Sequence, residues 1–188
     1  MAPSNAFKPE IENPYPGTFE TVSDFKYRTR LVLVRLPEAL RDRQLAKASY
    51  ILGEDYTVTF AVDGEPRELT VPRGMRSDLA SVPWGARNTV GRVGPHLEAA
   101  IVHDFLFIAW QLLGADHGPR RSDFRYANAV MFAGLEAADT GWLRQTAIKA
   151  ALNFPWVAWS VFKERDDEDS ALFVDLDRVD DGPPAAGT

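Results

Sequence analysis

The apolar segment from Leu97 to Trp110 constrains this chain most, because it is long enough for a helix and apolar on nearly every side. It therefore predicts a helix that is buried rather than one that lies at the surface. His103 and Asp104 nevertheless stand next to each other at the middle of the segment. Burying a neutral polar group without a partner costs about 2–7 kcal/mol, and burying a charge costs more. We therefore expect side chains, backbone groups, water or a metal ion to bind both residues.

The composition is typical of one globular domain. With 188 residues, of which 45% are hydrophobic, the chain can form one sizeable core but is too short for two domains that each have a sizeable core. It contains no cysteine, which excludes disulfides and thiolate metal ligands. Its polar, proline-rich start lacks an apolar core, so we expect no signal peptide. Polar residues interrupt both apolar stretches before about 18 residues, so we expect no membrane span.

Charge and proline content divide the chain into three parts. Residues 1–24 form a proline-rich N-terminal arm, residues 25–163 form a single globular domain, and residues 164–188 form an acidic tail. The tail holds nine acidic residues and two arginines, a net charge of −7, whereas the whole chain carries −6. The rest is nearly neutral and has no basic stripe, so we expect no nucleic-acid partner. Acidic tails of this kind are usually solvated.

The predicted strands come first and the helices follow, which indicates an α+β domain with helices covering a small antiparallel sheet. One strand is predicted within residues 31–34. Alternating apolar and polar residues over 56–62, then the Asp63-Gly64 turn and a second apolar run, predict a β-hairpin. Pro66 should move the second strand of this hairpin to a sheet edge or delay its start.

Helical segments make up most of the second half of the chain. The last of them contains Pro155, which predicts a kink or a break. A short helix is also predicted between the strands. The four predicted helices span residues 37–47, 97–113, 122–138 and 142–163.

Two motifs occur in a fixed order along the chain. Residues 71–83 read Val-Pro-Arg-Gly-Met-Arg-Ser-Asp-Leu-Ala-Ser-Val-Pro, and residues 99–107 read Ala-Ala-Ile-Val-His-Asp-Phe-Leu-Phe. Over roughly residues 50–162 the chain resembles domain-of-unknown-function family 1353, whose members are small proteins found in phages and prophages. The family pattern continues with an Arg-x-x-Ala-Asp helix. Here that helix has Ala127-Asn128, with Arg121 or Arg125 as the arginine. Asn128 can ligate a hard cation through its carbonyl oxygen, but it has no charge and cannot act as a base.

Three interpretations of Asp78, His103, Asp104 and Asn128 remain open. The first is a structural network that fastens a loop to the buried helix. The second is a site for one divalent metal, with Asp78, His103 and Asp104 as ligands, a donor set that suits Zn, Mn or Fe better than Ca. The third is metal-free catalysis in which His103 is a base oriented by a carboxylate. Neighbouring helical residues point about 100° apart, which disfavours one small centre shared by His103 and Asp104.

The sequence also offers candidate binding residues, two of which belong to this set. The candidate binding residues are Asp78, Ser81, Arg121, Arg125 and Asn128. His117 is interpreted as a solvent-exposed loop residue rather than a ligand. The C-terminal aromatic residues predict either core packing or a contact face; they are Trp142, Phe154, Trp156, Trp159 and Phe162.

Two functions follow as hypotheses. The resemblance and the two terminal arms favour a phage or prophage structural module, in the virion or the host cytoplasm, with other phage structural proteins as partners. The alternative is a metal-assisted hydrolase of a cell-wall peptide bond or a phosphoester, with His103 and Asp104 as its catalytic residues. The sequence leaves the oligomeric state open.

Overall fold

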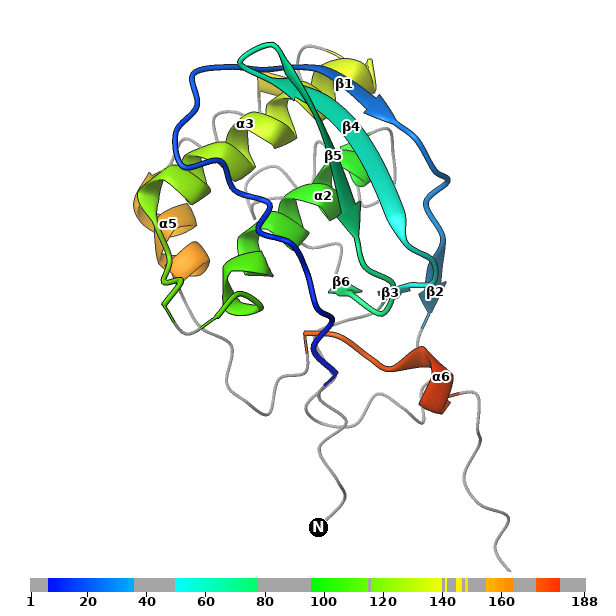
Figure 1. Ribbon diagram of the computed structural model, residues 1–188. Helices are drawn as coiled ribbons and strands as arrows, with labels where there is room; N and C mark the ends of the chain where they lie inside the picture. The colour runs from blue at the N-terminus through cyan, green and yellow to red at the C-terminus, as the bar shows by residue number, and fades with distance from the viewer. Residues whose placement is uncertain are drawn as a thin grey trace, which may run out of the picture.

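The computed structural model describes residues 7–35, 50–77, 96–114, 116–139, 141, 145–146, 148, 155–163 and 172–179. Its strands precede its long helices (Figure 1), so the predicted α+β class is confirmed. The predicted helix at 37–47 lies outside the described residues. The described elements are β1 (Val22–Tyr27), β2 (Leu33–Arg35), β3 (Tyr50–Leu52), β4 (Tyr56–Val62), β5 (Glu65–Val71), β6 (Arg76–Ser77), α2 (His96–Ile108), the 3₁₀ helix η2 (Ala109–Gln111), α3 (Arg121–Ala137), α5 (Pro155–Lys163) and α6 (Leu176–Val179).

The larger sheet contains the predicted hairpin. Its antiparallel strand order is β1-β4-β5, so β4 is central and β5 is an edge strand. Asp63 and Gly64 form the turn, with φ angles of 52° and 85°. Positive φ at both positions is what a two-residue hairpin turn of this kind requires. Pro66 lies in the edge strand, as predicted, but it does not delay the start of β5 at Glu65.

A smaller sheet, with the order β2-β3-β6, continues below the first in Figure 1. The strand predicted at 31–34 lies slightly before β2, and β1 is a strand that the sequence pattern did not predict. Only Phe25 of β1 is buried, and the pairing with β4 is irregular between Ser23 and Lys26. An interrupted strand with one buried residue lacks the regular alternation by which strands are recognised.

Helices α2 and α3 lie against one face of the larger sheet (Figure 1). Helix α2 has its apolar residues buried on nearly all sides, as predicted, and η2 prolongs it. The two helices pack closely at Gly134, where a Cβ atom would lie only 2.9 Å from the Ala99 side chain. The Gly134 carbonyl accepts a hydrogen bond of 2.8 Å from the Tyr27 hydroxyl, which ties α3 to β1. Every helix within the described ranges is too short or too polar to span a bilayer.

Segments near both ends of the chain pack on this domain. Tyr15, within the predicted N-terminal arm, is buried; its hydroxyl donates to the Leu106 carbonyl and accepts from the Trp110 amide. Phe173, within the predicted acidic tail, is fully buried and forms a β-bridge with Met75. The expectation of a solvated tail is therefore wrong at Phe173, whose aromatic side chain adds to the core although acidic residues lie nearby in the sequence.

Candidate functional site

His103 links the two long helices. Its Nε2 lies 3.0 Å from Oδ1 of Asn128 on α3, and its side chain is buried. An amide oxygen only accepts, so the neutral ring carries its proton on Nε2 and donates it to Asn128. Burial lowers the pKa of His103 to about 4, and the hydrogen bond to Asn128 opposes that shift only in part. At neutral pH the imidazole is therefore uncharged.

The environment of His103 is aromatic. The Phe107 ring, one helical turn further along α2, has its centre 4.2 Å from the imidazole centre. Phe107 packs in turn against Phe124 of α3 and Phe162 of α5. This apolar surrounding is the physical reason why the charged form of His103 is disfavoured.

The predicted C-terminal aromatic set contributes to this packing in part. Phe162 is buried, and Trp159 packs partly buried against it. Trp142, Phe154 and the side chain of Trp156 lie outside what the structure describes. Core packing is therefore the role of Phe162 and, in part, of Trp159.

Asp104 contacts a different part of the fold. It is half-buried, and its Oδ2 accepts a hydrogen bond of 3.2 Å from the Ser77 hydroxyl at the end of β6. His103 thus contacts α3, whereas Asp104 contacts the smaller sheet. The divergence follows from the angle of about 100° between successive helical side chains.

The remaining members of the predicted set are only partly described. Asp78 and Ser81 lie outside the described residues, so the metal set of Asp78, His103 and Asp104 stays a prediction. Within the described part of the chain, no three His, Cys, Asp or Glu side chains gather closely enough to hold a metal ion.

The two predicted arginines lie on the exposed part of α3. The Arg121 guanidinium carbon lies 4.1 Å from the centre of the Trp159 ring, a cation–π contact. Arg125 is also exposed. Neither forms an ion pair with any described residue, whereas Asn128, further along the same helix, is buried.

A second histidine contact, between His117 and Asp123, does not follow from the sequence pattern. His117 Nε2 lies 3.0 Å from Oδ2 of Asp123, which is 2% exposed, and the His117 ring stacks on Tyr15. The interpretation of His117 as a solvent-exposed residue is therefore wrong, because the N-terminal segment covers its ring. The available signal was an aspartate in the first turn of α3, six residues after a histidine. That signal does not reveal the contribution of Tyr15.

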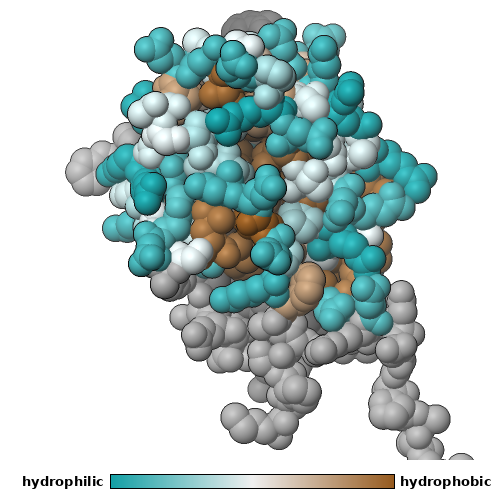
Figure 2. Space-filling model, viewed as in Figure 1, coloured by the Kyte–Doolittle hydropathy of each residue, from teal (hydrophilic) through white to brown (hydrophobic). Residues whose placement is uncertain are grey.

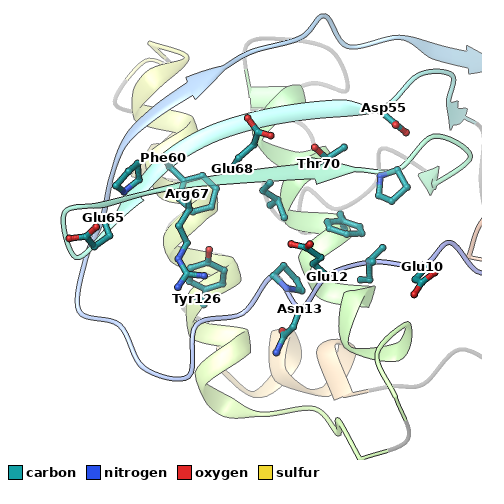
Figure 3. Close-up of a pocket in the computed structure, with 16 residues that line it drawn as sticks. Glu10, Glu12, Asn13, Asp55, Phe60, Glu65, Arg67, Glu68, Thr70 and Tyr126 are labelled. Carbon is teal, nitrogen blue, oxygen red and sulfur yellow. The ribbon is translucent and has the colours of Figure 1, made fainter.

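A groove of about 790 Å³ lies elsewhere, between β5 and the N-terminal segment (Figure 3). Neither His103, Asp104 nor Asn128 lines it. The buried pair of His103 and Asn128 and the groove are therefore separate features.

The comparisons with known proteins bear on the family alone. The family model described as "Protein of unknown function (DUF1353)" matches residues 54–151, more than half of the chain, so the chain belongs to this family. The matched region includes all elements from β4 to α3 and contains His103, Asp104 and Asn128. No curated protein and no solved structure matches the chain.

Proposed function

We propose that this protein is a virion-associated structural module of a phage or prophage, which docks onto neighbouring subunits. In this proposal His103 and Asp104 maintain the fold. One observation carries the structural role: each residue is bound by the domain itself, His103 by Asn128 and Asp104 by Ser77. The phage context is what the resemblance of the two sequence motifs implies.

The protonation state of His103 supports this proposal over acid–base catalysis. A general base works best when its pKa lies near the working pH. A buried imidazole with a pKa of about 4 accepts a proton poorly at neutral pH. Its Nε2 proton is already donated to Asn128. The arrangement suits a link between α2 and α3 better than a proton acceptor.

Purified particles test the virion role. Particles made by the host that encodes this chain are separated on a density gradient, and the chain is quantified across the fractions by mass spectrometry. We expect it at a constant molar ratio to the major capsid protein. A lysis enzyme of the same phage is the control that should be absent from the particle peak. Finding the chain only in the unsedimented fractions would overturn the virion role.

One observation favours the hydrolase as a second candidate. The half-buried Asp104 carboxylate lies beside Ser77, which directly precedes Asp78 in the sequence. The carboxylates of Asp78 and Asp104 would be oxygen ligands of the kind that a divalent cation binds. Elemental analysis for Zn, Mn and Fe tests the idea, with Asp78→Asn and Asp104→Asn as variants and Glu20→Gln as the control. About one bound metal per chain, lost in the first two variants only, would favour the hydrolase over the structural role.

A further inference from the structure

The groove has two walls of different kinds. One wall is β5, and the other is the stretch from Glu10 to Pro14, which passes along the same side of the domain (Figure 3). Leu69, Phe105 and Tyr126, all almost fully buried, lie at its base. Figure 2 shows apolar surface near the centre of this face, surrounded by hydrophilic side chains. A groove with an apolar floor and a polar rim is the usual form of a binding site.

The backbone of β5 leaves hydrogen-bonding groups facing the groove. In a hairpin with a two-residue turn, the residues flanking the turn exchange both hydrogen bonds, and this pattern repeats at every second residue. Glu65, paired with Val62, therefore turns its backbone groups toward β4, as do Arg67 and Leu69. The backbone groups of Glu68 and Thr70 point away from β4.

No strand in the described ranges pairs with that outer edge of β5. Pro66 also lies at an outward position, where its lack of an N–H leaves the pairing with β4 intact. The outward groups from Pro66 to Thr70 extend over about 13 Å at 3.3 Å per residue. This length of open edge is enough to pair with a short extended peptide.

The charge around the groove is strongly negative. It is lined by one guanidinium, that of Arg67, and by five carboxylates: those of Glu10, Glu12, Asp55, Glu65 and Glu68. A basic ligand would be attracted to this rim, and an acidic one would be repelled. The chain's own tail, with a net charge of −7 over residues 164–188, is therefore a poor occupant. A second copy that paired edge to edge would bring the same carboxylates together.

We propose that this groove binds an extended basic segment of a partner protein, which adds to β5 as a further antiparallel or parallel strand. Strand addition to an open sheet edge draws affinity from backbone hydrogen bonds and specificity from alternate side chains. Apolar side chains of the segment would face Leu69 and Phe105. Its basic side chains would face the carboxylates of the rim. The proposal does not depend on the virion role.

A synthetic peptide tests the proposal with the full chain. The probe is a capped heptapeptide of alternating lysine and valine, and its binding is measured by calorimetry at low salt. The same peptide with glutamate in place of lysine is the charge control. Two further peptides carry N-methyl groups on either the lysines or the valines. Because only every second peptide N–H faces β5, we expect one of these to lose at least about tenfold in affinity and the other to bind normally.

Hydrogen exchange locates the bound peptide. We expect slower exchange at the Glu68 and Thr70 amides on binding, and little change at Arg67 and Leu69, which already pair with β4. Glu12→Lys and Glu68→Lys should weaken binding at least about tenfold, whereas the exposed Glu20, outside the groove, should tolerate Glu20→Lys.

Three outcomes would overturn the proposal. The first is no binding of the lysine–valine peptide at about 1 mM, which would mean that the charged rim only protects the edge from pairing. The second is binding without protection of the Glu68 and Thr70 amides. The third is protection of these amides that rises with protein concentration in the absence of peptide, which would assign the edge to a second copy of this chain.

Discussion

Two regions of the molecule differ in whether their polar groups have partners. One is the hydrogen bond between His103 and Asn128, and the other is the outer edge of β5. Within the helical layer, a buried imidazole has a partner from the next helix at 3.0 Å. At the sheet edge, the backbone groups of Glu68 and Thr70 face a groove and find no partner strand within the described ranges. Satisfied interior groups stabilise a fold, whereas open edge groups retain the capacity to bind another chain. Substitutions in the two regions should therefore have different consequences.

The largest expected effect is a change in the free energy of unfolding with pH, caused by the titration of His103. The pKa of this residue is about 4 in the folded protein, against 6.5 for a histidine in the unfolded chain. Below pH 6.5 the unfolded chain takes up a proton that the folded protein does not accept until about pH 4. The free energy of unfolding should therefore fall by about 3 kcal/mol between these pH values. Urea denaturation at several pH values measures this.

His103→Gln is the matched variant for that experiment, because glutamine can donate to Asn128 but does not titrate. The variant should show a shallower loss of stability between pH 6.5 and pH 4, while the carboxylates contribute equally to both proteins. If the free energy of unfolding falls equally with pH in the two proteins, burial does not lower the pKa of His103. The proposed difference between the helical layer and the sheet edge would then be contradicted.

The next largest effect on the free energy of unfolding is expected from truncating His103 or Asn128. His103→Ala leaves the Asn128 amide buried without this partner, so the free energy of unfolding should fall by about 1–3 kcal/mol at neutral pH. Asn128→Ala should have a similar effect, and a double-mutant cycle should give a coupling of about 1 kcal/mol. Unchanged stability of His103→Ala together with loss of a hydrolytic activity would instead identify a catalytic residue.

The contact between Asp104 and Ser77 should matter less. Ser77→Ala removes one hydrogen bond of 3.2 Å to a half-buried carboxylate, so we expect a loss of about 0.5–1.5 kcal/mol in chemical denaturation. The exposed Ser23 on β1 provides the control variant, Ser23→Ala. An equal loss in both variants would remove the special role of the contact.

The elements with strong periodic patterns could be predicted from the sequence. Helix α3 lies within one residue of its predicted bounds, and α2 together with η2 covers most of the helix predicted at 97–113, because long apolar or amphipathic runs encode them locally. The hairpin turn followed from Asp63-Gly64. Strand β1 could not be predicted, because it depends on pairing with β4 rather than on its own pattern.

Some features of the candidate site could likewise be predicted from the sequence, and others could not. The burial of His103 follows from its neighbours in the sequence, so it could be predicted. The stacking of His117 on Tyr15 and the groove beside β5 could not, because both depend on where residues 10–15 pass over the domain. Local patterns carry no information about such contacts between distant segments.

The smallest expected effect on stability lies at the groove. Glu12 and Glu68 are exposed, so Glu12→Lys and Glu68→Lys should change the free energy of unfolding by no more than about 0.5 kcal/mol. Chemical denaturation of both variants beside Glu20→Lys measures this. The same two variants should lose peptide binding, whereas His103→Gln should keep it at neutral pH. A large loss of stability in either groove variant would show that the carboxylates hold the N-terminal segment in place, and the edge of β5 would then serve the fold as His103 does.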